Sequence, residues 1–195
     1  MEQRVITLFH ESIEAKMQAG EYLAPLIAQG SELMVDTLLN GQKILACGNG
    51  TSAAQAQILS AALLNRFENE RPSLPAIAIG ADQITSSAIA SDANANDIYA
   101  KQIRALGQSG DLLVLINATG SNGSLVQAIS AAHDRDMPVI ALTGRDSEDI
   151  SSLLDNRDLE LKAPGTTLAR IHELHLLVIF CLCDLIEQQL FGSHQ

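Results

Sequence analysis

The chain has 195 residues, of which 47% are hydrophobic and 3% aromatic, and its formal net charge is −11. This length and apolar content suit one packed domain, so we predict a single domain over residues 1–195. The acidic balance and the absence of a basic block exclude a nucleic-acid-binding surface, which needs concentrated positive charge. No apolar run reaches the ~18 residues of a membrane span, and the chain does not begin like a signal peptide. We therefore expect a cytoplasmic protein that contacts neither membrane nor nucleic acid directly.

Two amphipathic helices are predicted before the first strand. Residues 3–19 carry apolar side chains at helical spacing, and residues 31–40 do so again before Asn40-Gly41, a common pair at helix ends. A sheet that begins later in the chain cannot cover both helices. We therefore expect residues 1–41 to pack partly against another subunit.

Strands and helices alternate from Lys43 onward. The predicted strands are 44–47, 76–79, 112–116, 139–142 and a more polar edge strand at 159–162, and the predicted helices are 51–66, 83–91, 95–106 and 122–134. Strands that are apolar on both faces and separated by helices are typical of a parallel sheet covered on both sides. The fold class is therefore α/β, a doubly wound, five-stranded parallel sheet over residues 42–165.

A long closing helix is predicted over 167–190, within the C-terminal segment 166–191. It is apolar almost all round, which is typical of a helix buried in an oligomer core. The three cysteines, Cys47, Cys181 and Cys183, lie in apolar runs without metal-ligand spacing. We expect them to be buried free thiols, and we predict no disulfide.

A glycine loop, Gly48-Asn49-Gly50-Thr51-Ser52, follows the first predicted strand. The glycines allow a tight turn, and the hydroxyl of Thr51 or Ser52 is expected to cap the next helix. The amides at the start of that helix form a ready anion site. The loop therefore favours a phosphorylated small molecule, although its spacing matches neither the dinucleotide motif nor the P-loop.

A second loop, Ile116 to Ser124, follows the third strand and contains Asn117, Thr119 and Asn122. In open α/β sheets, ligands bind at the carboxyl ends of strands where the winding direction reverses, so the two loops are expected to face each other there. Either loop alone is equally well explained as a tight turn with a cap. The pair favours a ligand.

Several longer motifs carry a resemblance to a known family. They are Gly48-Asn49-Gly50-Thr51-Ser52-Ala53, Arg66-Phe67-Glu68-Asn69-Glu70-Arg71-Pro72, Ala100-Lys101-Gln102-Ile103-Arg104-Ala105-Leu106-Gly107, Ala141-Leu142-Thr143-Gly144 and Cys181-Leu182-Cys183-Asp184-Leu185-Ile186. Over essentially its whole length the chain resembles the SIS (sugar isomerase) domain, in the phosphoheptose isomerase branch. It is most similar to members of that branch that bind the bacterial replication initiator DnaA. The resemblance implies a flavodoxin-like SIS fold, a homotetramer and DnaA as a partner.

Isomerisation of a sugar phosphate needs a general base, a group that polarises the carbonyl, and phosphate anchors. The isomerase branch has a histidine and a glutamate on the helix after the first loop, and a glutamine and a histidine on the last helix. The resemblance places Ile58, Ala62, His172 and Phe180 at those positions. Ile58, Ala62 and Phe180 can neither move a proton nor bind a metal. We therefore predict no catalytic residue, no metal and no cofactor.

The resemblance also implies a ligand-binding set. Its members are Asn49, Gly50, Thr51, Ser52, Asp92, Asn117, Thr119, Asn122 and His172. The branch commonly reads Ser-Thr-Ser-Gly-Asn-Ser where this chain has Asn117-Ala118-Thr119-Gly120-Ser121-Asn122, so hydroxyl groups have been lost. Asp92 resembles a crevice residue of the family, yet acids in such positions are more often caps or solvated loop residues. His172 and His175 lack a third ligand for zinc, and we expect them to be hydrogen bonded instead.

Leu190 and Phe191 precede a polar C-terminal tail. If exposed, they could anchor a partner, whereas the alternative is that they pack on the helix's own core. The favoured function is a non-catalytic adaptor that binds DnaA and promotes its assembly at the chromosomal origin. The alternative is a phosphoheptose isomerase that acts on sedoheptulose 7-phosphate for lipopolysaccharide heptose synthesis. A third possibility is a phosphosugar-responsive regulator.

Overall fold

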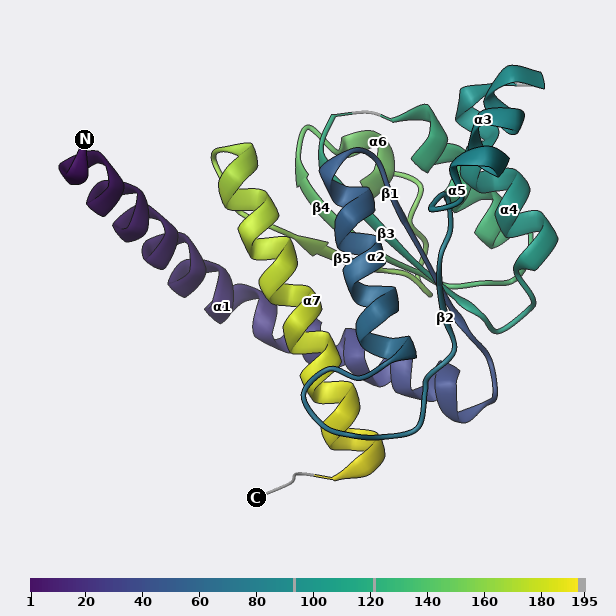
Figure 1. Ribbon diagram of the computed structural model, residues 1–195, viewed down its shortest axis with the longest axis horizontal. Helices are drawn as coiled ribbons and strands as arrows, with labels where there is room; N and C mark the ends of the chain where they lie inside the picture. Colours follow the sequence, from purple (N-terminus) through teal and green to yellow (C-terminus); the bar gives the residue numbers. More distant parts are fainter. Residues whose placement is uncertain (93, 121, 193–195) are drawn as a thin grey trace.

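Five parallel strands form one sheet in the order β2-β1-β3-β4-β5 in a computed structural model that describes residues 1–92, 94–120 and 122–192 (Figure 1). The strands are β1 (Ile44–Gly48), β2 (Ala76–Ala78), β3 (Leu112–Thr119), β4 (Val139–Arg145) and β5 (Leu159–Lys162). The predicted doubly wound α/β fold is confirmed, with the polar strand β5 at one edge. Strands β3 and β4 extend farther at their carboxyl ends than predicted, which lengthens the edge that carries the second loop.

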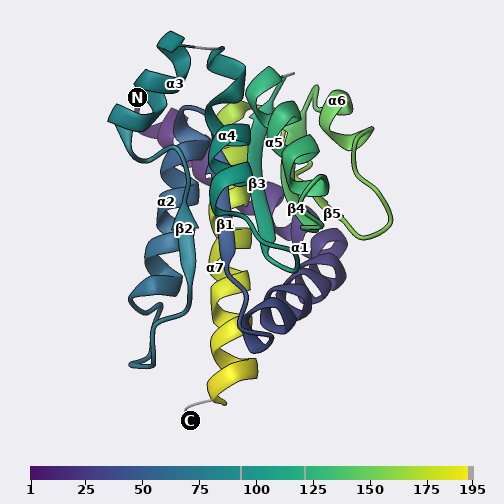
Figure 2. The ribbon, with the colours of Figure 1, turned by 90° about the vertical axis from the view of Figure 1, so that its right-hand side faces the viewer.

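Helices cover both faces of the sheet. They are α1 (Glu2–Leu39), α2 (Thr51–Leu64), α3 (Gln83–Asp92), α4 (Ile98–Leu106), α5 (Gly123–His133), α6 (Glu148–Ser151) and α7 (Leu168–Phe191). Helices α1, α2 and α7 pack on one face, and α4 and α5 pack on the other (Figure 2). The predicted helix 95–106 begins as a short 3-10 helix, Ala95–Asp97, where the Asn94 side chain accepts a hydrogen bond from the Asn96 amide.

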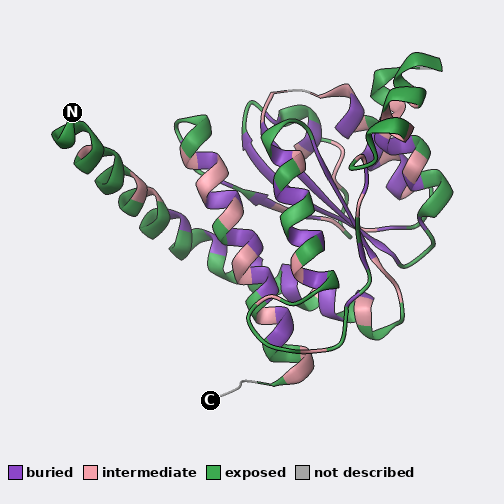
Figure 3. Ribbon diagram, viewed as in Figure 1, coloured by how far each residue is buried: buried purple, intermediate pink, exposed green. Residues whose placement is uncertain are grey.

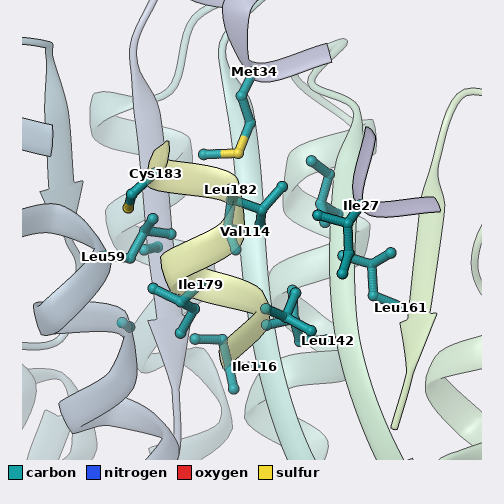
Figure 4. Close-up of a cluster of buried hydrophobic side chains, with 14 of the residues drawn as sticks. Ile27, Met34, Leu59, Val114, Ile116, Leu142, Leu161, Ile179, Leu182 and Cys183 are labelled. Atoms are coloured by element: carbon teal, nitrogen blue, oxygen red, sulfur yellow. The ribbon is translucent and has the colours of Figure 1, made fainter. Parts of the chain in front are cut away.

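Alternate residues of the central strands point into two separate cores. Val114 and Ile116 of β3 belong to the core under α1, α2 and α7, whereas Leu113 and Leu115 belong to the core under α4 and α5. Figure 4 shows Val114 beside Leu182 and Ile116 beside Ile179, both of α7. Because both faces of each strand are buried, the strands read as continuous apolar runs.

Helix α1 is one continuous helix of 38 residues, so the prediction of two separate helices within residues 1–41 was wrong. Pro25 lies inside α1 and lacks the amide that a helix needs, an effect that costs about 3 kcal/mol in isolation. Tertiary packing overrides this cost, since Leu23, Ile27 and Met34 are buried in the core. Gly30 allows the close approach, because a Cβ there would lie 3.2 Å from the side chain of Leu159.

The N-terminal half of α1 extends beyond the rest of the domain (Figure 1). Its apolar side chains are exposed, with Val5 at 52%, Phe9 at 67% and Met17 at 70% (Figure 3). Next to them lies a groove of about 490 Å³ between α1 and α7, lined mainly by apolar side chains that include Leu23 and Phe180. Contiguous exposed apolar surface of this kind is typical of an interaction site.

Helix α7 has the length and hydropathy of a membrane span. Ile179, Leu182 and Ile186 are nevertheless completely buried against the sheet and its neighbouring helices. The helix is therefore the core helix of this domain, and its hydropathy is explained by packing. Cys47 and Cys183 are buried free thiols as predicted, while Cys181 is only half-buried.

Candidate functional site

The two glycine loops lie side by side at the carboxyl edge of the sheet. Strands β1 and β3 are neighbours, and the chain leaves them in opposite directions, so this is the topological switch point. The Asn49 side-chain amide donates to the Ser124 hydroxyl over 2.9 Å and joins the loops directly. The Tyr99 hydroxyl lies 2.5 Å from the Gly48 carbonyl and 2.9 Å from Asn49 Oδ1. The expectation that the loops face each other is confirmed.

The first loop turns tightly because of its glycines. A Cβ on Gly48 would lie 2.8 Å from backbone atoms of Ser52, and Gly50 has a φ of 56°. The prediction that Thr51 or Ser52 caps helix α2 was wrong. Gly50 is the N-cap residue, so both hydroxyl residues lie inside the first turn of the helix, where Ser52 is buried and Thr51 is exposed.

The second loop is braced by its own asparagines. The buried Asn117 amide donates to the Gly120 carbonyl over 2.9 Å and to the Ser147 hydroxyl over 3.1 Å. Asn117 Oδ1 accepts a hydrogen bond of 2.8 Å from the Asn122 amide. Both predicted ligand contacts therefore hold the loop in shape, and Thr119 lies half-buried at the end of β3. Ser121 lies outside the described residues.

His172 lies on α7 and is tied to α2. Its Nδ1–H donates to Gln55 Oε1 over 3.2 Å, and the Gln55 amide donates to the His172 carbonyl over 2.8 Å. Partial burial lowers the pKa of His172. Because Gln55 follows Ser52 by one turn of α2, this pair fixes the start of α7 beside the first loop.

His175 is completely buried one turn after His172. Its Nε2–H donates to the Thr143 carbonyl over 3.0 Å, and its Nδ1 has no hydrogen-bond partner among the described residues. Burial lowers the pKa of His175 to about 4, so the ring is neutral near pH 7. The expectation that both histidines are hydrogen bonded is confirmed.

Three of the four positions that the resemblance assigns to the catalytic set carry apolar side chains. Ile58 is 38% exposed, Ala62 and Phe180 are half-buried, and the Phe180 ring packs 5.7 Å from the ring of Phe67. Asp92 lies at the exposed end of α3, and within the described chain no hydrogen bond links it to either loop. The carboxyl edge thus offers polar contacts and few groups that can move a proton.

Tyr99 was missed by sequence reasoning. Burial raises the pKa of Tyr99 to about 12, so its hydroxyl stays neutral and can donate to the first loop. Tyr99 is 51 residues from Gly48 in sequence, and no local pattern links the two. Tyr99 could have been found from the sequence by expecting the predicted helix 95–106 to pack beneath the first loop.

Leu190 and Phe191 are half-buried at the far end of α7. The guanidinium carbon of Arg71 lies 5.9 Å from the centre of the Phe191 ring. Leu190 and Phe191 thus pack partly on the core and keep some exposed surface, so the structure is compatible with both packing on the core and contact with a partner. Residues 193–195 of the polar tail lie outside the described residues.

A group with metal-ligand character lies elsewhere, at His133, Asp155 and Asp158, whose ligand atoms all lie within 4.8 Å of one another. Asp158 already accepts hydrogen bonds from His133 and from the amides of Val139 and Asp155, each over 2.8 Å. Asp155 also pairs with the Arg157 guanidinium, which lowers the pKa of its carboxyl. These contacts account for the group as a structural brace at the start of β4.

Comparison with known proteins gives consistent matches over nearly the whole chain. The family description of the SIS domain matches residues 8–144. A phosphoheptose isomerase of Chromohalobacter salexigens is 55% identical over 192 residues, covering 98% of this chain and 98% of the relative. The DnaA initiator-associating protein DiaA of Pectobacterium carotovorum is 49% identical over 195 residues, covering 100% of this chain and 99% of the relative. The structure of a phosphoheptose isomerase from Francisella tularensis is 41% identical with a TM-score of 0.92, covering 95% of this chain and 97% of that one.

Proposed function

The chain belongs to the family of SIS-domain proteins, and we propose that within this family it is a non-catalytic adaptor that binds the replication initiator DnaA and promotes its assembly at the chromosomal origin. One observation carries this proposal. Ile58, Ala62 and Phe180 stand at the positions that the resemblance assigns to the base and the metal ligands. Full-length relatives named DiaA, 48% to 49% identical to this chain, support the choice of partner.

Aldose–ketose interconversion requires both a base and a group that polarises the carbonyl. His172 is the one protic side chain of the four aligned positions. The neighbouring His175, with a pKa of about 4, is too weak a base for use near pH 7. Among the described residues, the four aligned positions and His175 therefore do not supply the pair of groups that the reaction needs.

A phosphosugar could still bind at the two loops. Helices α2 and α5 both begin there, and neither has a side-chain cap within the described chain, so the positive ends of both helices adjoin the loops. The amides of Ser52, Ala53 and Leu125 already donate to backbone carbonyls of the loops, so an anion would rely on the helix dipoles and the remaining amides. The proposed binding set is Asn49, Gly50, Thr51, Ser52, Asp92, Asn117, Thr119, Asn122 and His172. Sedoheptulose 7-phosphate should then raise the melting temperature without being converted. No shift at millimolar concentration would contradict this retained site.

The exposed apolar face of α1 supports a homotetramer. The proposed partner DnaA also implies a cytoplasmic protein, since the two proteins must meet in the same compartment. Phe9 and Met17 lie on this face, beside the apolar groove between α1 and α7. Light scattering should give four times the 20.8 kDa chain mass for the wild type and a smaller mass for Phe9→Glu. A monomeric wild type would contradict the tetramer.

A phosphoheptose isomerase remains the second candidate. The 55% identical relative and the solved structure with a TM-score of 0.92 both carry that name. Turnover of sedoheptulose 7-phosphate separates this candidate from the adaptor.

The test of the adaptor is binding to purified DnaA. Wild-type protein should bind, and the double variant Leu190→Ala/Phe191→Ala should lose about tenfold or more in affinity if these residues are hot spots. Ile84→Ala is a matched control, because Ile84 is an exposed apolar residue on α3. Failure of the wild type to bind would contradict the proposed function. Equal binding by wild type and double variant would contradict only the contact.

A further inference from the structure

A buried ion pair joins helices α2 and α7 at the end opposite the glycine loops. Arg71 Nε donates to Glu187 Oε1 over 2.8 Å, and the two side chains are only 2% and 5% exposed. Figures 1 and 2 show α2 and α7 running side by side toward this end. A buried charge pair needs satisfied hydrogen bonds on both partners, so the remaining contacts of each side chain are informative.

The Arg71 guanidinium is held by three carbonyls in addition to Glu187. Its terminal nitrogens donate to the carbonyls of Ala62 over 2.6 Å, Leu63 over 2.9 Å and Pro72 over 3.0 Å. Ala62 and Leu63 belong to the last turn of α2, whose carbonyls have no partner within the helix. Four hydrogen bonds from one rigid planar group fix its orientation.

Glu187 organises the loop that follows α2. Its carboxylate accepts hydrogen bonds from the amides of Phe67 over 3.0 Å, Glu68 over 3.3 Å and Asn69 over 3.2 Å. Burial raises the pKa of Glu187, but these bonds and Arg71 outweigh burial, and the net pKa lies below its ordinary value. The carboxylate is therefore ionised, and the loop is wrapped around it.

Phe191 lies on α7 one turn beyond Glu187, so both residues are on the same side of the helix. The Arg71 guanidinium carbon is 5.9 Å from the centre of the Phe191 ring, within the range of a cation–π contact. Phe191 is also the last residue of α7, where helices fray. The guanidinium therefore gives the ring a fixed surface in addition to its partial packing on the core.

We propose that Arg71 and Glu187 are positioning residues that hold the Phe191 ring ready for a protein partner. A ring that is ordered before binding loses less conformational freedom on binding, which raises affinity without any new contact. This inference rests on the proposed role of Phe191 in binding DnaA and deepens it. Neither Arg71 nor Glu187 needs to touch the partner.

The first test measures the ring without any partner. The chain contains no tryptophan, so Phe191→Trp introduces a unique fluorophore at this position. Adding Arg71→Lys or Glu187→Gln should raise acrylamide quenching about twofold and lower the fluorescence anisotropy, since the positive charge remains but is no longer held in a fixed position against the ring. The matched control is Glu70→Gln, which breaks the exposed Arg66–Glu70 pair in the same loop and should leave both readings unchanged. Unchanged quenching in the folded Arg71→Lys protein would overturn the inference.

The second test is a double-mutant cycle on DnaA affinity. Arg71→Lys should weaken binding about tenfold alone and less than about twofold in the Phe191→Ala background, because its effect passes through the ring. Equal losses in both backgrounds would indicate a general structural role and overturn the inference. Circular dichroism verifies that each variant is folded. If Glu187→Gln does not fold, Arg71→Lys alone is used in both tests. A wild type that fails to bind DnaA would overturn the proposed function, whereas the quenching result would still decide whether the pair positions the ring.

Discussion

The two ends of the α2–α7 helix pair are held together in different ways. At the carboxyl edge of the sheet, Gln55 and His172 are joined by neutral hydrogen bonds beside half-exposed polar loops. At the opposite end, Arg71 and Glu187 form a buried ion pair that also organises a loop and an aromatic ring. The strongest interactions therefore lie away from the glycine loops, at the end that we assign to partner binding.

This difference fits a scaffold that keeps the shape of a sugar-phosphate site without its chemistry. The loop geometry at the carboxyl edge depends on backbone and amide contacts, such as Asn49 to Ser124. Partner binding at the other end depends on a fixed surface. Substitutions at the two ends should therefore differ in size and in what they impair.

The largest effect is expected from Glu187→Ala. Removing the carboxylate leaves the buried Arg71 charge without its partner and three loop amides without their acceptor, and the free energy of unfolding should fall by about 3–5 kcal/mol. Urea unfolding at fixed protein concentration measures this. Glu70→Ala, in an exposed pair of the same loop, should cost less than about 1 kcal/mol. A similar small loss for both variants would remove the contrast between the two ends.

The next largest effect is a loss of folding stability at acidic pH, caused by His175. The pKa of His175 is about 4 in the folded protein against an ordinary value of 6.5, so between these values the unfolded chain binds more protons. Stability should therefore be lost as pH falls from about 6.5 to 4, and this group's contribution is about 3 kcal/mol. His175→Gln keeps a donor for the Thr143 carbonyl but cannot titrate there. An identical pH dependence in wild type and variant would contradict the assignment.

Gly48→Ala should disturb the carboxyl edge selectively. A Cβ at this position would lie 2.8 Å from backbone atoms of Ser52, so the first loop must shift, at a cost of about 1–3 kcal/mol. The stabilisation by sedoheptulose 7-phosphate should disappear, while DnaA binding stays intact. Thermal melting with and without the sugar measures the first effect. A normal ligand shift in a folded Gly48→Ala protein would argue against binding at these loops.

The smallest effect is expected from Gln55→Ala. It removes two neutral hydrogen bonds between α2 and α7 beside the first loop, and the net loss should be about 1–2 kcal/mol. Chemical unfolding of Gln55→Ala and Glu187→Ala under the same conditions compares how much each contact contributes to the free energy of unfolding. If Gln55→Ala were the more destabilising variant, the carboxyl edge would be the stronger end of the helix pair.

Much of the fold could be predicted because both faces of the central strands are buried. Consecutive residues such as Val114 and Leu115 are therefore both apolar. These continuous apolar runs distinguish the strands from the amphipathic helices between them. Helix α1 was predicted as two helices because helical apolar spacing was identified only over residues 3–19 and 31–40, whereas the packing of Leu23 and Met34 that stabilises one helix through Pro25 is visible only in three dimensions.

The candidate site was less predictable than the fold. Polar residues in a glycine loop are read as ligand contacts, but Asn117 and Asn122 bind each other and brace the loop. The Arg71–Glu187 pair left no local trace, since 116 residues separate its members. The position of the two loops was predictable because parallel strands end at one edge.

The proposed adaptor role predicts that this SIS-domain chain does not isomerise a sugar phosphate. The most direct measurement incubates the purified protein and added zinc with sedoheptulose 7-phosphate, beside an active phosphoheptose isomerase, and quantifies the isomerised product. We predict no product above the blank from a preparation that binds DnaA. Turnover that is abolished by Ser52→Ala or His172→Ala would contradict the account.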